Sequence, residues 1–121
     1  MADLPSTYLL VDANVLIDYV KTERAVLASA ARHVGTVYVL TTVIDEVAEL
    51  DASECERLGL HVVEPSLSQL ATAAGKRGRL SFQDHLCLVL ARDHGWTCVT
   101  NDGALRKACS RDDIPVLWGL E

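Results

Sequence analysis

The sequence lacks an apolar run that could cross a bilayer, which takes about 20 residues. Its first residues, Met1 to Ser6, also lack the basic stretch and long apolar segment of a signal peptide. We therefore expect no membrane association and a cytoplasmic location. Apolar residues make up 50% of the 121 positions, which excludes a disordered chain and suffices for a single domain over residues 1–121.

Closely spaced soft metal ligands are also absent. The four cysteines are far apart and form no Cys-x-x-Cys pair, which argues against a structural zinc site and against a disulfide framework. The four histidines form no two-histidine metal motif. Cys87 and Cys98 fall inside apolar runs, so we expect them to be small core residues.

Positive charge is scarce, with 11 Lys and Arg against 17 Asp and Glu, for a net charge of -6. This is the wrong sign for a protein that holds nucleic acid by its overall charge. The objection weakens if carboxylates gather and bind metal, since two divalent ions cancel four charges. The densest basic cluster, Lys76, Arg77 and Arg79, is either an RNA-binding patch or a solvated loop.

Short apolar runs alternate with longer helix-compatible segments. The runs at 8–11, 37–40, 60–63, 96–100 and 115–118 predict strands, and continuous apolar character is typical of parallel strands covered on both faces. Helices are expected over 14–20, 23–33, 41–50, 66–74, 81–94 and 102–109, with a polar turn region at 51–59. This order predicts a three-layer α/β/α fold around a central parallel sheet of about five strands.

Three carboxylates fall at comparable places in this pattern. Asp12 ends the first strand, Asp102 follows the fourth, and Asp84 lies in the first turn of the helix that leads into the fourth strand. In a doubly wound sheet, strands one and four are neighbours where the winding reverses, so their ends flank the ligand crevice. Neighbouring carboxylates repel in a low-dielectric site unless a cation intervenes, which favours a divalent metal.

Each of these acids also has a purely structural interpretation. Asp12 and Asp102 are suitable N-caps, and Asp84 follows Ser81 by three residues, as in a capping box. Capping explains each residue singly, and the three together less well. A fourth candidate is Glu46, but Asp45 stands beside it and position alone does not choose between them.

Three stretches resemble PIN-domain nucleases, in the order and spacing of that family and over nearly the full length of the chain. They are residues 10–18, residues 44–47, and residues 80–84 running on to 99–102. A chain of this size is similar to the VapC-type toxins of toxin–antitoxin pairs. The resemblance implies acidic catalytic and metal-binding residues with two polar neighbours: Asp12, Glu46, Asp84 and Asp102, with Asn14 and Thr100.

The resemblance also implies an activity. Carboxylate oxygens suit Mg²⁺ or Mn²⁺, and the expected reaction is hydrolysis of single-stranded or structured RNA to a 5′-phosphate and a 3′-hydroxyl. It further implies a homodimer and a small antitoxin that inserts a segment into the acidic crevice. The alternatives are a housekeeping RNA-processing nuclease and a catalytically silent interaction module. A phospho-accepting receiver domain is disfavoured, because Asp12 is followed by Ala13 and not by a second acid.

Overall fold

The computed structural model describes residues 8–45, 47, 50–75, 78 and 80–118. Within these residues five strands form one parallel sheet in the order β3-β2-β1-β4-β5. The parallel sheet and the pairing of the first strand with the fourth are therefore confirmed. The strands are β1 (Tyr8–Val11), β2 (Thr36–Leu40), β3 (His61–Val63), β4 (Thr97–Thr100) and β5 (Val116–Trp118).

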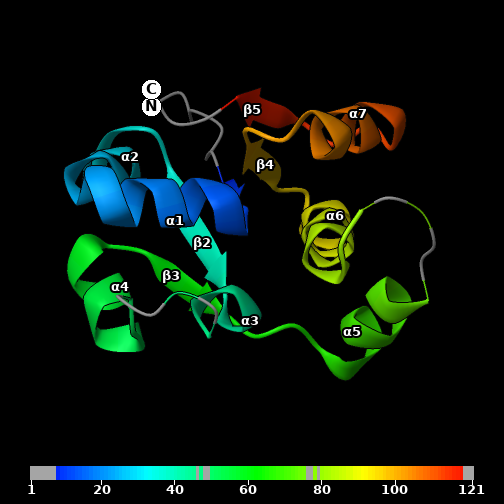
Figure 1. Cartoon of the computed structure of the whole chain (residues 1–121), viewed down its shortest axis with the longest axis horizontal. Helices are drawn as coiled ribbons and strands as arrows, with labels where there is room; N and C mark the ends of the chain where they lie inside the picture. Colours follow the sequence, from blue (N-terminus) through cyan, green and yellow to red (C-terminus); the bar gives the residue numbers. More distant parts are fainter. Residues whose placement is uncertain (1–7, 46, 48–49, 76–77, 79, 119–121) are drawn as a thin grey trace, which may run out of the picture.

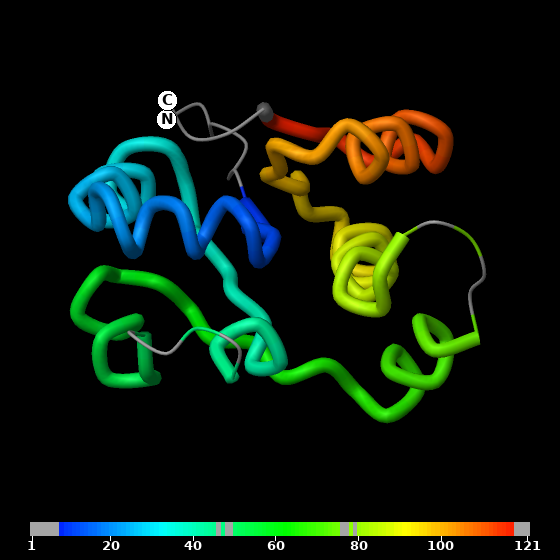
Figure 2. The backbone as a smooth tube through the Cα atoms, in the orientation of Figure 1, coloured from blue at the N-terminus to red at the C-terminus, as the bar shows by residue number. Residues whose placement is uncertain are grey.

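Helices cover both faces of the sheet, which confirms the three-layer architecture (Figure 1). One side carries α1 (Ala13–Thr22), α2 (Arg24–His33), α3 (Thr41–Ile44) and α4 (Ala52–Leu58). The other side carries α5 (Leu67–Ala74), α6 (Phe82–His94) and α7 (Gly103–Arg111). Figure 2 shows the short connection along the bottom of the view, residues 64–66, that brings the chain from β3 to α5 on the other face of the sheet. None of the helices in the described part of the chain is long and apolar enough to cross a membrane.

The core lies on both sides of β1, which explains why this strand is continuously apolar. Leu9, Leu10 and Val11 are all fully buried. Helix α6 buries every residue from His85 to Ala91. All four cysteines are free and buried, so they pack as core residues. The ends of β1 and β4 are thereby held in a rigid, close-packed frame.

The predicted helix over residues 41–50 is wrong in length, because α3 ends at Ile44. The Val47 N–H then donates to the Ile44 carbonyl at 3.0 Å, and the Leu50 N–H donates to the Val47 carbonyl at 3.2 Å. Neither Val47 nor Leu50 is helical, and both are buried in the core. Burial of the two apolar side chains therefore outweighs the helical spacing of the segment.

The polar stretch at 51–59 contains a helix, α4, that the apolar pattern did not predict. Asp51 caps it by accepting the Glu54 N–H at 2.8 Å, and Gly59 ends it in the left-handed conformation at φ 81°. Cys55 is its one buried residue, so a hydrophobic stripe is almost absent. By contrast, α2 ends at His33 with Val34 as a C-cap in the ordinary right-handed conformation.

Candidate active site

Asp12 leaves β1 and begins α1. Its Oδ1 accepts the Val15 N–H at 2.9 Å, which makes it the N-cap of the helix. Its own N–H donates to the Val99 carbonyl at 3.0 Å, which extends the β1–β4 pairing by one residue. The side chain is only 2% exposed. The capping role considered from the sequence is therefore real, and it fixes this carboxylate at the switch between β1 and β4.

Thr100 connects Asp12 with Asp102. The fully buried Thr100 hydroxyl donates to Asp12 Oδ2 and accepts the Asp102 N–H at 3.0 Å. Asp102 Oδ2 in turn accepts the Leu105 N–H at 3.0 Å and caps α7. Thr100 thus holds Asp102 through its main chain and orients Asp12 through its carboxylate. The polar neighbour predicted from the sequence lies between the two acids.

Asp84 lies at the start of α6 and closes a capping box with Ser81. The Asp84 N–H donates to Ser81 Oγ at 3.1 Å, and the Ser81 N–H donates to Asp84 Oδ2 at 3.4 Å. The side chain is half-buried. Like Asp12 and Asp102, Asp84 caps a helix, so all three structural interpretations hold in the structure.

Burial raises the pKa of the Asp12 carboxyl above its ordinary value of 3.8, because loss of hydration disfavours the ionised form. Hydrogen bonds from the Thr100 hydroxyl and the Val15 N–H favour the ionised form and act in the opposite direction. The charge of Asp84 raises the pKa of Asp12 further. Asp12 and Asp84 are therefore close enough to repel each other, although they come from different helices.

A pocket of about 450 Å³ opens where these elements meet. Two of the three acids, Asp84 and Asp102, line it together with the exposed amide of Asn14. Asp12 is not a lining residue, although the two residues that follow it in α1 are. The N-termini of α1, α6 and α7 all contribute to the wall, and helix N-termini attract anions. The pocket therefore combines carboxylates with a backbone environment that favours a phosphate group.

Gln83 is a lining residue that the sequence did not single out. Its Nε2 donates to the Thr42 carbonyl at 3.2 Å, and its Oε1 accepts the Thr42 hydroxyl at 3.0 Å. This pair ties α3, after β2, to the start of α6 at the pocket. The available signal was its place between Ser81 and Asp84, but no pattern in the sequence links it with Thr42.

Several predicted residues lie outside the described part of the chain. They are Glu46, the fourth acid, and the basic cluster Lys76, Arg77 and Arg79. Asp45, the other candidate for the fourth acid, is exposed and lines a different cavity of about 350 Å³.

The donor chemistry of the pocket bears on the predicted metal. In the residues that the structure describes, no group of three or more His, Cys, Asp or Glu side chains could hold a metal ion as they stand. The oxygen donors at the pocket are the carboxylates of Asp84 and Asp102 and the amide of Asn14. Mg²⁺ is commonly held by one or two carboxylates together with water and substrate phosphate. The donor set therefore fits Mg²⁺ or Mn²⁺, and the assignment of ligands stays a prediction.

Comparison with known proteins identifies the fold. Neither a protein-family model nor a curated protein sequence matches the chain. Solved structures do match, and they show that the chain has the fold of PilT N-terminus (PIN) domains. The resemblance predicted from the sequence is thus confirmed for the fold.

Three of these structures illustrate the match. A PilT N-terminus domain protein from Sulfolobus solfataricus has a TM-score of 0.69 at 9% identity, over 92% of this chain and 86% of that chain. VapBC2 from Rickettsia felis, bound to a DNA fragment from its promoter, has a TM-score of 0.65 at 15% identity, over 92% and 98%. FitAcB from Neisseria gonorrhoeae has a TM-score of 0.53 at 19% identity, over 90% and 96%.

Proposed function

We propose that this protein is a divalent-metal-dependent endoribonuclease that hydrolyses phosphodiester bonds of single-stranded RNA. The observation that carries the proposal is the pairing of Asp84 and Asp102 in one pocket at the β1–β4 switch point. Buried Asp12 lies close enough to be influenced by the charge of Asp84. Acids that approach one another in this way are characteristic of sites that gain stability from a bound cation.

Asp12, Asp84 and Asp102, together with Glu46, would hold Mg²⁺ or Mn²⁺. Such an ion, when bound, supplies acidification of water and neutralisation of charge on the scissile phosphate. Of the chain's own residues, Thr100 keeps the Asp12 carboxylate in one orientation. The Asn14 amide, exposed at the pocket wall, donates a hydrogen bond to a phosphate oxygen of the substrate.

The similarity in fold also bears on protein partners. The chain shares its fold with VapBC2 and FitAcB, and its sequence resembles VapC-type toxins. We therefore infer that it is the toxin of a toxin–antitoxin pair, a cytoplasmic homodimer held inactive by a small antitoxin. Co-expression with the products of the two reading frames that flank its gene, followed by size-exclusion chromatography, tests this: a stable complex with one of them is expected, and separate peaks for both would contradict it.

Cleavage of a labelled single-stranded RNA in Mn²⁺ tests the catalytic proposal. Asp84→Asn and Asp102→Asn should abolish cleavage, and both should fold, because asparagine is as good an N-cap as aspartate at position 102 and keeps an oxygen for the Ser81 N–H at position 84. Asp18→Asn is the matched control, since Asp18 is exposed on α1, and it should retain full activity. Full activity of Asp84→Asn, free of contaminating nuclease, would remove Asp84 from the site.

A second candidate function is an interaction module without catalysis. It is favoured by the observation that Asp12, Asp84 and Asp102 each already cap a helix. The melting temperature in Mn²⁺ distinguishes the two functions. A bound ion at 100 times its Kd stabilises the folded state by about 2.7 kcal/mol, so a nuclease should melt measurably higher in Mn²⁺. An unchanged melting temperature would favour the silent module.

A further inference from the structure

A second cavity lies between α6 and α7, beside the acidic pocket. Its volume of about 470 Å³ falls in the range typical of small-molecule binding sites. Leu80 and Ala104 line both this cavity and the acidic pocket, so the two spaces share a wall. The cavity between the helices therefore lies next to any ligand held at Asp84 and Asp102.

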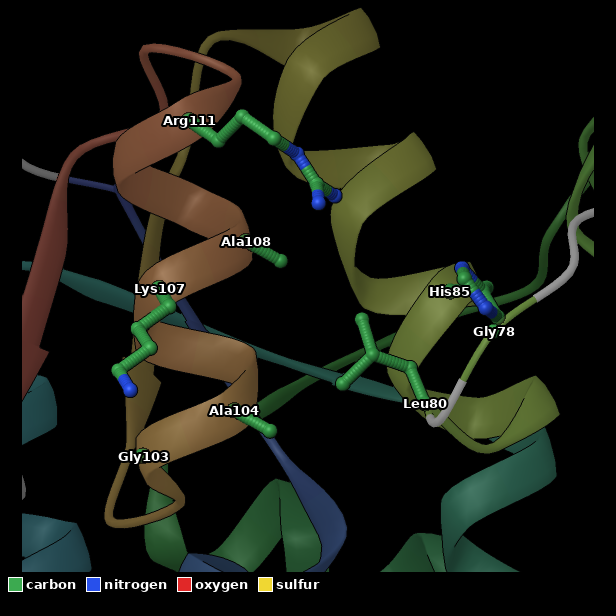
Figure 3. A pocket seen from close by; sticks show the side chains of 8 residues that line it. All are labelled: Gly78, Leu80, His85, Gly103, Ala104, Lys107, Ala108 and Arg111. Carbon is green, nitrogen blue, oxygen red and sulfur yellow. The ribbon is translucent and has the colours of Figure 1, made fainter.

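Most of the cavity wall is apolar. In Figure 3, Leu80 points from the segment before α6 towards α7, and the methyl groups of Ala104 and Ala108 face it. The small side chains on α7 leave room between the helices. A planar group with apolar faces would gain contact on both sides here, without displacing any large side chain.

His85 supplies a polar group in this otherwise apolar wall. The residue is only 9% exposed, and its Nε2 is buried without a hydrogen-bond partner in the described part of the protein. A buried ring nitrogen without a partner costs free energy, which a ligand with a hydrogen-bonding edge would recover. His85 lines this cavity and not the acidic pocket.

Two cations on α7 border the cavity. Arg111 reaches across towards α6, and Lys107, one turn earlier, lies on the side of α7 that faces away from α6 (Figure 3). Arg111 Nε lies 3.6 Å from Asp112 Oδ1, but both side chains are exposed and such pairs are weak in water. An apolar slot bordered by cations suits a strand that alternates planar bases with negatively charged phosphates.

We propose that this cavity binds the base of the nucleotide next to the phosphate that is cleaved. His85 Nε2 forms a hydrogen bond with the edge of the base, and Leu80 packs against its face. Arg111 and Lys107 contact the phosphates of the strand. The position of the base relative to the cleaved bond rests on the proposed nuclease function, whereas base binding itself can be measured without cleavage.

Fluorescence anisotropy of the full chain in EDTA tests base binding directly. The probes are labelled A12, C12 and U12 ribo-oligonucleotides and an abasic strand with the same number of phosphates. At least one of the three should bind roughly 2- to 12-fold more tightly than the abasic strand, as expected for one net hydrogen bond to the base. His85→Phe should reduce the differences in affinity among the three bases.

The proposed phosphate contacts of Lys107 and Arg111 can be tested separately. A Lys107→Ala/Arg111→Ala variant should weaken binding to all strands alike and reduce the salt dependence of log Kd by about one to two contacts. Lys21→Ala/Arg32→Ala is the matched control, because it removes the same charge from exposed positions on α1 and α2. The control should bind and discriminate like the wild type.

A readout in the wild type avoids any question of whether the variants fold. The NMR signal of the His85 ring, identified by its absence in His85→Phe, should shift when the preferred strand is added. An unmoved signal together with equal binding of abasic and normal strands would overturn the proposal. A signal that responds to N-acetyl-leucine amide and to none of the strands would assign the cavity to a protein partner, and would also overturn it.

The two proposals fail in different ways. Mn²⁺-dependent RNA cleavage that is unchanged in both the His85 and the Lys107/Arg111 variants would retain the nuclease and reject the base pocket. Base-dependent binding with no cleavage in Mn²⁺ would reject the nuclease and support the pocket.

Discussion

Replacing Thr100 by valine would break the link between β1 and β4 at the candidate site. The Thr100 hydroxyl is fully buried, donates to Asp12 Oδ2 and accepts the Asp102 N–H. Valine has nearly the same shape, so the substitution leaves no cavity and removes the hydrogen bonds alone. The variant therefore isolates the contribution of one hydroxyl to the stability of the whole chain.

The two hydrogen bonds of Thr100 set the size of the effect on the free energy of unfolding. A hydrogen bond to a charged group contributes about 1.5–3 kcal/mol, and one between neutral groups about 0.5–1.5 kcal/mol. Thr100 makes one of each, so Thr100→Val should lower the free energy of unfolding by about 2–4 kcal/mol. For a domain of this size, that corresponds to a fall in melting temperature of roughly 10 °C.

The stability lost in Thr100→Val should also depend on pH. The bond from Thr100 lowers the pKa of Asp12, which burial raises, so its removal should raise this pKa further. Between the ordinary value of 3.8 and the folded pKa, the native state binds more protons than the unfolded state, and stability increases as pH falls. The difference between wild type and variant should therefore be largest at pH 7–8 and smaller near pH 4.

Urea unfolding followed by circular dichroism at pH 8 and pH 4, in EDTA, measures both effects. Thr97→Val is the matched control, because Thr97 is a half-buried threonine on the same strand, and it should change stability by less than about 0.5 kcal/mol. A Thr100→Val variant as stable as the wild type at pH 8, or a loss of equal size at both pH values, would refute the reasoning.

Other substitutions test the remaining parts of the frame. Asp12→Asn removes the buried charge whose raised pKa costs stability above pH 4, so the change in melting temperature from pH 4 to pH 8 in EDTA should be more favourable than in the wild type, with no response to Mn²⁺; the same pH dependence as the wild type would contradict this. Ser81→Ala should cost about 1 kcal/mol in urea unfolding because it removes the cap of α6, whereas Ser68→Ala, exposed on α5, should be nearly neutral. Gly95→Ala should cost about 1–2 kcal/mol, since φ is 72° although nothing lies within 4 Å of an added Cβ. An added Cβ at Gly103 would also have space, but Gly103 lies in α7 at an ordinary φ, so Gly103→Ala should raise the free energy of unfolding by about 0.5–1 kcal/mol. A similar change at both glycines would show that backbone conformation is not the cause.

The strands were predictable because burial on both faces leaves little choice of residue. Leu9, Leu10 and Val11 had to be apolar, and the positions of Asp12 and Asp102 at strand ends follow from the parallel order. Apolar patterning did not predict α4, because Cys55 is the one residue that this helix buries. The feature that indicates α4 in the sequence is the capping acid at its start, Asp51.

The connections within the site were not predictable in the same way. That Thr100 orients Asp12, and that Gln83 pairs with Thr42, depends on distances between elements that lie 88 and 41 residues apart in the chain. No local pattern encodes a contact of that kind. The sequence could therefore indicate which residues approach the pocket but not which of them hold one another in place.

Helix capping and metal binding are not competing explanations for the acids at the pocket, Asp84 and Asp102. A helix cap uses one carboxylate oxygen, as Asp84 Oδ2 does towards the Ser81 N–H and Asp102 Oδ2 does towards the Leu105 N–H. Each Oδ1 is then held in a direction set by a rigid helix end. At Asp84 and Asp102 the caps therefore fix the orientation of the carboxylate and leave Oδ1 outside the capping bond, whereas both oxygens of Asp12 accept hydrogen bonds. The capping bonds of Asp84 and Asp102 are therefore compatible with the proposed metal site: they pre-orient the two carboxylates, whose negative charge must offset the positive helix N-termini before a cation can bind.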